Sequence, residues 1–471
     1  MKETNRKTGL DTLFYPDAIA VLGASEDRSR IGSLALHFLL RHGYTGRIYP
    51  VNPKYKKVMG LPCYASLAEI PEAIDLALIG IPRSFVLDVL KECAGKKIPS
   101  VILYSAGYAE MGSAGRREQE ELKAFARSNG IRIVGPNCIG IINFHGPVAA
   151  SFISGLEMEP LLRGGIALVT QSGGIGNTIL TRANDRFIGL SYFVSSGNEL
   201  DLEAADFLEY FLKDKKTRAI SFLLEDLKDP QKFSRWAGKA REAGKPILVL
   251  KVGRSEKGRQ AASSHTGAIS GPDSFYEALF RQRDICRVFD IDELFEVGNL
   301  FVKYGRAGGN RAAILSTSGG SGALLADLTA DQHIDLPLPS PQTRNRLVDW
   351  VPAVATIANP MDITTQFMND PEAMDQYLHA FADDPNYDFL ILMLTFSSKK
   401  KSREIAERIA ETWLGLSKPL IICWPVGNIA GEAFRILEKK GVPVFFHPGR
   451  CLSAVGHFVR YGVKTRTSQT F

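Results

Sequence analysis

Short apolar runs alternate along the chain with segments whose apolar residues recur at helical spacing. The first runs cover residues 18–23 (AIAVLG), 47–51, 76–81, 100–105 and 131–134, and residues 33–42 form the first helical segment. Strands that are buried on both faces of a parallel sheet consist of continuous Val, Ile and Leu residues. Strands with one solvent-exposed face instead alternate between apolar and polar residues. The pattern therefore predicts βαβ units and a doubly wound α/β sheet.

The same pattern restarts twice. The second set covers residues 165–170, 190–194, 219–224 and 246–252, and the third covers 311–316, 389–394, 419–424 and 442–446. We therefore expect three domains, at residues 1–145, 146–305 and 306–471, with linker character at 305–310 (GRAGGN). The second set opens with LVTQSGGIG and the third with LSTSGGSG, which indicates an internal repeat of strand, Ser-Gly-Gly turn and helix.

Composition narrows the class of protein without naming a function. A length of 471 residues fits roughly three domains of about 150 residues. The excess of 57 basic over 51 acidic residues, +6, is too mild to indicate nucleic-acid binding. Six cysteines without CxxC spacing argue against a zinc or redox framework and fit a reducing cytosol. No signal peptide or membrane-length apolar run is present, so we expect a cytoplasmic protein.

A glycine-rich turn, VLGASEDRSRIG at 21–32, follows the first predicted strand. The missing Cβ atoms of Gly23 and Gly32 would let a phosphate-bearing ligand approach the backbone at a helix N-terminus. The spacing is not GxGxxG, and the second strand runs into Asn52-Pro53-Lys54 instead of the acid that binds the ribose of NAD. A Rossmann-like site better matched to coenzyme A than to NAD is therefore predicted.

Loops after the other strands of the first set belong to the same edge, because ligands of open α/β sheets bind at the carboxyl ends of strands. These loops are GIPR at 80–83, SAGY at 105–108 and GPNCIG at 135–140. The residues expected to bind coenzyme A are Gly23, Ala24, Ser25, Ile31, Gly32, Asn52, Pro53, Lys54, Ile81, Pro82, Ser105, Ala106, Gly107 and Asn137.

The two Ser-Gly-Gly turns are candidate phosphate sites. Each would direct backbone N–H groups and a helix N-terminus at a negative group, so that one phosphate could be bound from two sides. The expected phosphate-binding residues are Gln171, Ser172, Gly173, Gly174, Ser318, Gly319 and Gly320.

His265 is the candidate nucleophile. It lies in AASSHTGA, residues 261–268, which we predict to be a flexible, exposed loop after a strand and a basic stretch. Imidazole is a competent nucleophile at neutral pH, but it needs a carboxylate to orient its other nitrogen. Glu225, at the end of the strand 219–224, is a plausible partner. Taken alone, a loop histidine is usually an ordinary surface residue, and the other seven histidines keep that interpretation.

In combination these motifs resemble the ADP-forming acyl-CoA synthetases, in particular the alpha subunit of the split acetate–CoA ligase, and more distantly succinyl-CoA synthetase. The resemblance rests on GAS…IG at 23–32, NPK at 52–54, GPNC at 135–138, QSGG at 171–174, SSGNELD at 195–201, SHTGA at 264–268 and NPMDIT at 359–364. It implies a Rossmann-like coenzyme A-binding domain followed by two flavodoxin-like domains. It also implies exchange of acyl-CoA, ADP and phosphate with carboxylic acid, ATP and coenzyme A.

The resemblance further implies residue roles and a partner. His265 would take the phosphoryl group from an acyl phosphate and deliver it to nucleotide, and Glu225 would hold the phosphohistidine. We recognise no ATP-grasp domain, the part that binds Mg–ATP in this family, so a separate beta subunit and an α2β2 assembly are expected. No metal site, nucleic acid or membrane partner is expected for this chain. The carboxylic acid, ADP or GDP preference and the physiological direction stay open.

Two other functions are compatible with parts of the sequence. A non-catalytic sensor of coenzyme A or nucleotide would keep the fold, but it would not need His265, Glu225 and both Ser-Gly-Gly turns. An NAD-dependent oxidoreductase would need an acid where Lys54 stands.

Overall fold

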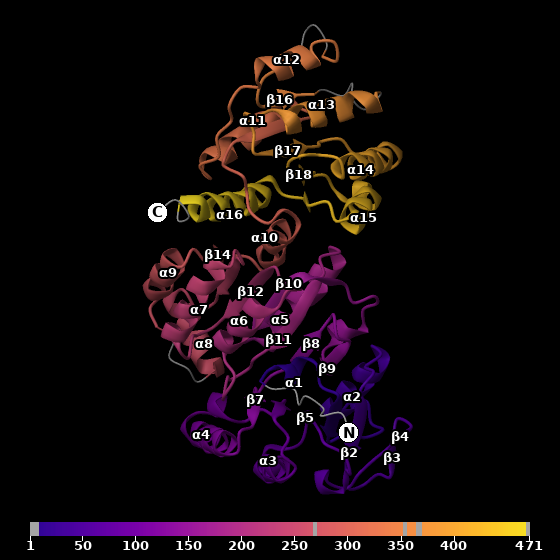
Figure 1. Cartoon of the computed structure of the whole chain (residues 1–471), viewed down its shortest axis with the longest axis vertical. Coiled ribbons are helices and arrows are strands. Elements are labelled where there is room, and N and C mark those ends of the chain that lie inside the picture. Colours follow the sequence, from indigo (N-terminus) through magenta and orange to yellow (C-terminus); the bar gives the residue numbers. More distant parts are fainter. Residues whose placement is uncertain (1–8, 267–270, 352–355, 364–369, 468–471) are drawn as a thin grey trace, which may run out of the picture. The chain divides into compact units, whose positions relative to one another are not determined.

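The computed structural model describes residues 9–266, 271–351, 356–363 and 370–467. The chain forms two compact units, Met1–Asn184 with Gly189–Leu294, and Asp185–Ile188 with Phe295–Phe471. The first unit contains two large sheets and the second unit contains one, each accompanied by helices (Figure 1). The predicted fold class, a Rossmann-like sheet followed by two flavodoxin-like doubly wound sheets, is confirmed.

The first sheet has five parallel strands in the order β2-β1-β5-β6-β7. Its strands are β1 (Ala18–Leu22), β2 (Arg47–Val51), β5 (Leu76–Ile79), β6 (Ser100–Leu103) and β7 (Arg132–Val134). The connecting helices are α2 (Ile31–Arg41), α3 (Val86–Gly95) and α4 (Ser113–Ser128), with a short hairpin of β3 (Lys57–Val58) and β4 (Leu61–Pro62) after β2. The strand order reverses between β1 and β5, and ligands of such sheets bind outside the carboxyl ends at that point.

The second sheet has seven strands in the order β14-β13-β12-β10-β11-β8-β9. Its parallel part consists of β10 (Arg163–Thr170), β11 (Leu190–Ser195), β12 (Ala219–Leu224), β13 (Ile247–Lys251) and β14 (Cys286–Val288). A hairpin that the sequence pattern did not predict, β8 (Gly140–Asn143) and β9 (Val148–Ser151), joins antiparallel at the edge. The helices are α5 (Gly173–Asp185), α6 (Ala204–Lys213), α7 (Pro230–Glu242), α8 (Glu256–Thr266) and α9 (Asp273–Gln282).

The third sheet lies in the second unit and has the order β16-β15-β17-β18-β19, all parallel. Its strands are β15 (Ala312–Ser316), β16 (Met361–Asp362), β17 (Phe389–Met393), β18 (Leu420–Cys423) and β19 (Val444–Phe445). The helices are α10 (Ile291–Tyr304), α11 (Gly319–Ala330), α12 (Pro341–Leu347), α13 (Pro371–Asp383), α14 (Lys399–Trp413), α15 (Gly431–Lys440) and α16 (Pro448–Thr467). The central strands are buried along their whole length, as the continuous apolar runs predict.

The two sheets of the first unit share one hydrophobic core. Ile19 and Leu78 from the first sheet belong to the same buried cluster as Ala167 and Val194 from the second. Helix α1 (Asp11–Phe14) contributes Phe14, whose ring centre lies 5.0 Å from that of Tyr192 in β11. Burial of one such aromatic side chain contributes about 1.5–3 kcal/mol. The loops at the carboxyl edges of both sheets therefore belong to one compact unit.

None of the helices in the described part of the chain is both long and apolar enough to cross a lipid bilayer.

Candidate active site

Three glycines pack the β1–α2 turn tightly against the end of β5. A Cβ on Gly23, whose φ is +82°, would lie 2.5 Å from the carbonyl oxygen of Gly80, and a Cβ on Gly32 would lie 2.8 Å from that of Gly23. The missing side chains therefore make room for neighbouring backbone. The approach of a phosphate-bearing ligand to Gly23 and Gly32 stays a prediction, and the structure adds a packing role for both glycines. The dense packing still places the first turn of α2 beside the switch point between β1 and β5.

Hydrogen bonds join the other loops predicted to bind coenzyme A. The Asn52 side-chain amide donates to the carbonyl oxygen of Ala24 at 2.8 Å, and its own oxygen accepts the backbone N–H of Lys54 at 3.0 Å. The Ser105 hydroxyl donates to the carbonyl oxygen of Ile81 at 2.6 Å. The backbone N–H of Asn137 donates to the carbonyl oxygen of Ser105 at 3.0 Å. The structure thus brings these residues to one edge of the first sheet.

The loop after β11 connects this edge to the second sheet. The backbone N–H groups of Asn198 and Leu200 donate to the carbonyl oxygens of Pro136 and Gly135, each at 2.9 Å. A Cβ on Gly197 would lie 2.3 Å from the carbonyl oxygen of Pro136, so only glycine allows this contact. The segment SSGNELD, one of the motifs that carry the family resemblance, therefore connects the predicted coenzyme A loops to the second sheet.

Gln171 follows β10 and reaches across to the residues that follow β12. Its side-chain oxygen accepts the backbone N–H groups of Glu225 at 2.6 Å and of Asp226 at 3.0 Å. Its amide nitrogen donates to the carbonyl oxygen of Asp226 at 2.8 Å. Sequence analysis expected Gln171 to bind phosphate, and that part stays a prediction. The structure adds a second role that the sequence pattern did not indicate. The Gln171 side chain fixes the backbone of Glu225, the acid at the end of β12.

The two Ser-Gly-Gly turns have the same local geometry. The backbone N–H of Ser172 donates to the Thr170 hydroxyl at 3.2 Å, and that of Ser318 donates to the Ser316 hydroxyl at 3.3 Å. The N–H groups of Gly176 and Gly322 both donate to the serine carbonyl four residues earlier, at 3.0 Å. This agreement confirms the internal repeat. Helices α5 and α11 begin at Gly173 and Gly319, so each turn places N–H groups without a helical partner at a strand end.

Glu225 comes directly after β12, beside the point where the order of the second sheet reverses between β10 and β12. The residue is 9% exposed. Its backbone is held on both sides, because Gln171 accepts its N–H and the Lys251 ammonium donates to its carbonyl oxygen at 2.8 Å. The sequence prediction of a strand-end position is confirmed.

His265 does not lie in a loop as expected, because the backbone of residues 256–266 forms helix α8 and places His265 in its last turn. Residues before His265 such as Gln260 and Ala261 are compatible with a helix, although the neighbouring serines favour turns by themselves. The His265 side chain and residues 267–270 lie outside the described part of the structure. Its pairing with Glu225 therefore stays a prediction.

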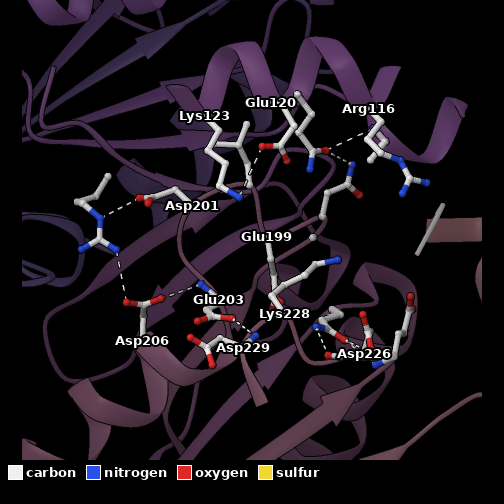
Figure 2. Close-up of a pocket in the computed structure, with 18 of the residues that line it drawn as sticks. Arg116, Glu120, Lys123, Glu199, Asp201, Glu203, Asp206, Asp226, Lys228 and Asp229 are labelled. Carbon is white, nitrogen blue, oxygen red and sulfur yellow. Dashed lines mark hydrogen bonds and ion pairs between the residues drawn. The ribbon is translucent and has the colours of Figure 1, made fainter. Parts of the chain in front are cut away.

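Glu199 is a buried acid in the SSGNELD loop that sequence analysis did not single out. Its backbone has a φ of +55°, and one carboxyl oxygen accepts the Ser196 hydroxyl at 2.9 Å and the Ala204 N–H at 3.2 Å. The other oxygen is buried and has no hydrogen-bond partner among the described residues. Burial raises the pKa of Glu199 to about 7, although the charge of Lys228, drawn near it in Figure 2, opposes the shift.

A cavity of about 420 Å³ lies between α4 and the loops that follow β11 and β12 (Figure 2). Gln171, Glu199 and Glu225 all line it. Much of its remaining charge is paired: Arg132 contacts Asp201 at 2.8 Å, and Lys232 lies 3.0 Å from Glu203. The cavity borders the SSGNELD loop and the strand-end acid Glu225.

Comparisons with known proteins agree with this geometry. Residues 17–143 match the family model of a CoA binding domain, and residues 163–301 match that of a succinyl-CoA ligase like flavodoxin domain. The chain is 35% identical over 446 residues to subunit alpha of the ADP-forming acetate–CoA ligase II of Pyrococcus furiosus, covering 93% of this chain and 95% of that subunit. It is also 35% identical to the ADP-forming acetate–CoA ligase I of Archaeoglobus fulgidus, covering 96% of this chain and 64% of that longer protein.

A solved structure supports the same relationship. The dinucleotide-forming acetyl-coenzyme A synthetase 1 of Ca. Korarchaeum cryptofilum, in complex with phosphate and ADP, matches with a TM-score of 0.89 and 32% identity over 98% of each chain. Identity and coverage at this level extend through all three sheets. This protein therefore belongs to the family of the alpha subunits of ADP-forming acetate–CoA ligases.

Proposed function

We propose that this chain is the coenzyme A-binding, phosphohistidine-carrying subunit of an ADP-forming acyl-CoA synthetase. The observation that carries the proposal is the placement of Glu225, which is held by Gln171 at the switch point of the second sheet. The predicted coenzyme A loops belong to the same compact unit, and hydrogen bonds of the SSGNELD loop connect the two sheets. Thioester chemistry and phosphoryl transfer would thus take place on one compact unit.

The proposed reaction has three group transfers. Phosphate attacks the thioester carbonyl, a C–O bond forms, the C–S bond breaks, and coenzyme A leaves as the thiol after taking up a proton. A ring nitrogen of His265 then attacks the phosphorus of the acyl phosphate, the P–O bond breaks, and the carboxylate leaves. Finally an oxygen of ADP attacks the phosphohistidine, the N–P bond breaks, and ATP forms. A covalent intermediate on nitrogen lets two separate sites share one phosphoryl group.

The first site would use the residues assigned from the sequence. Glu225 would accept a hydrogen bond from the second ring nitrogen of His265 and stabilise the phosphorylated ring. The turn at Ser172, Gly173 and Gly174 would supply N–H groups to the phosphoryl oxygens, as would the turn at Ser318, Gly319 and Gly320. A helix N-terminus favours a negative group by typically 0.3–1 kcal/mol, so several such contacts would be needed.

The nucleotide would be bound by a partner. The Pyrococcus relative is named a subunit alpha, and the chain spans only 64% of the Archaeoglobus ligase, so the complete reaction is proposed for a complex and not for this chain alone. We propose a separate ATP-grasp beta subunit that holds Mg–ATP, in an α2β2 assembly located in the cytoplasm. The acid substrate would be a small carboxylic acid.

The test is transfer of the terminal phosphate of radiolabelled ATP to the purified chain in the presence of the ATP-grasp partner. Acid-labile label is expected on the wild type and on His333→Asn, a control at an exposed histidine whose φ of +56° suits asparagine. Label is expected to be absent from His265→Ala. A wild type without label, next to a partner shown to bind ATP, would contradict the proposal and favour a non-catalytic coenzyme A-sensing module.

A further inference from the structure

Lys251, the last residue of β13, places a buried ammonium group against the backbone carbonyl of Glu225, the strand-end acid. The residue is 2% exposed. Its ammonium donates to the carbonyl oxygens of Glu225 at 2.8 Å and of Val252 at 2.5 Å. Burying an ammonium is costly even when it is hydrogen-bonded, and an apolar residue would serve packing alone better. This position therefore indicates a requirement beyond the stability of the core.

Tyr276 from α9 contacts both Lys251 and the residue that follows Glu225. The Lys251 ammonium lies 4.5 Å from the centre of the Tyr276 ring, and the Tyr276 hydroxyl donates to the carboxylate of Asp226 at 2.7 Å. Gln171 holds the same two residues, Glu225 and Asp226, from the β10 side. The backbone after β12 is thus fixed from both of its neighbouring strands, although it follows the end of regular hydrogen bonding in the sheet.

The charges around Lys251 are mostly negative. The carboxylates of Asp226, Asp273 and Glu225 face it, together with one guanidinium, that of Arg287. Burial is the main influence on its pKa and lowers it, whereas the three carboxylates act in the opposite direction. A phosphoryl group next to Glu225 would add negative charge to this set. A cation fixed beside the Glu225 backbone would reduce the electrostatic cost of that approach.

We infer that Lys251 is a positioning residue for phosphoryl transfer, acting through its hydrogen bond to the carbonyl of Glu225. The bond fixes the backbone from which the Glu225 carboxylate extends, and the charge offsets the negative charge of the phosphohistidine. This inference rests on the proposed function and adds to it a residue that touches neither coenzyme A nor nucleotide.

Lys245, which lies just before β13, provides a matched control for substitutions of Lys251. It precedes β13 and donates from its ammonium to the carbonyl oxygens of Phe211, at 2.9 Å, and of Asp214. Burial lowers its pKa as it does that of Lys251. The two lysines therefore make the same kind of contact at opposite ends of β13, and only Lys251 lies beside Glu225.

The experiment uses the full chain with its ATP-grasp partner and compares Lys251→Met, Lys251→Arg and Lys245→Met with wild type. The readouts are the rate of labelling of His265 from radiolabelled ATP, the lifetime of the label, and the affinity for coenzyme A. We expect Lys251→Met to slow labelling about ten-fold or more, the loss typical of a hydrogen bond to a charged group. Lys251→Arg should restore part of the rate, and coenzyme A affinity should stay at the wild-type level in all three variants.

Equal labelling rates and lifetimes in Lys251→Met and wild type would overturn the inference, and so would equal losses in Lys251→Met and Lys245→Met. If Lys251→Met does not fold, Tyr276→Phe decides instead, because it removes only the hydroxyl that holds Asp226. Slower labelling by Tyr276→Phe with unchanged coenzyme A affinity would support the inference, and unchanged labelling would overturn it. A wild type that takes no label at all would contradict the proposed function itself. That outcome differs from a failure of the Lys251 inference, in which the wild type is labelled.

Discussion

The side-chain oxygen of Gln171 lies 2.6 Å from the backbone nitrogen of Glu225, although 54 residues separate the two in the chain. The contact bridges β10 and β12, the strands between which the order of the second sheet reverses. Side chains at such a point sit in a crevice outside the sheet and are free to serve a ligand. Here the Gln171 side chain fixes the backbone of Glu225.

Replacing Gln171 by alanine should impair phosphorylation without affecting coenzyme A binding. The change removes one acceptor and one donor that together hold Glu225 and Asp226, and each lost hydrogen bond is worth about 0.5–1.5 kcal/mol. We expect labelling of the chain by radiolabelled ATP to slow by about ten-fold or more, with the coenzyme A affinity measured by calorimetry unchanged. Wild-type labelling by Gln171→Ala would show that Glu225 does not depend on this contact.

Replacing Glu199 by glutamine should stabilise the protein, and more so at high pH. Its pKa is raised from 4.5 to about 7 in the folded state, so the folded state binds the proton more tightly than the unfolded state. The resulting stability is fully present below pH 4.5 and is lost as pH rises through about 7. The free energy of unfolding that the wild type loses through ionisation of Glu199 is at most roughly 3 kcal/mol at pH 8.

Chemical unfolding of wild type and Glu199→Gln at pH 5 and pH 8 checks this expectation. The gap in the free energy of unfolding should be larger at pH 8. A gap of the same size at both pH values would mean that Glu199 does not titrate in this range.

Glycine is required at position 32 for packing. In Gly32→Ala the new Cβ would lie 2.8 Å from the backbone of Gly23, and overpacking of this kind costs typically 1–3 kcal/mol. We expect a lower unfolding midpoint together with weaker coenzyme A binding. Gly95→Ala is the matched control, since Gly95 ends α3 and a Cβ there would meet no atom within 4 Å, so alanine should be neutral or stabilising by up to about 1 kcal/mol. Equal losses in both variants would contradict the packing argument.

Lys54 should contribute to coenzyme A affinity through charge. It is exposed, and its backbone N–H is held by Asn52 at the edge where coenzyme A is proposed to bind. We expect Lys54→Ala to weaken coenzyme A binding several-fold at low salt and less at high salt, because exposed charges are screened. Lys56→Ala, an exposed lysine two residues further along, should have a smaller effect. An effect of Lys54→Ala that does not change with salt would exclude an electrostatic contribution.

Most strands of the three sheets were predictable because they are buried on both faces. Runs such as Leu76–Ile79 are continuous in apolar residues, as expected for strands that are buried on both faces of a parallel sheet. The hairpin of β8 and β9 was missed because these short strands are stabilised by pairing, of β8 with β11 and of β9 with β8, and not by a local pattern. Helix α8 was missed because Ser and Thr around His265 favour loops by themselves, and the glycine after them suggested a turn.

The sequence alone determined the central parallel strands of the three sheets, the repeated Ser-Gly-Gly turn and the strand-end position of Glu225, since each follows from local pattern and spacing. Only the tertiary structure decided which groups act on Glu225. Gln171, Lys251 and Tyr276 come from segments up to about a hundred residues apart, and nothing local marks a glutamine or lysine whose partner is a distant backbone group. Sheet topology brings these segments together, because strand order, and not order along the chain, decides which strand ends are neighbours.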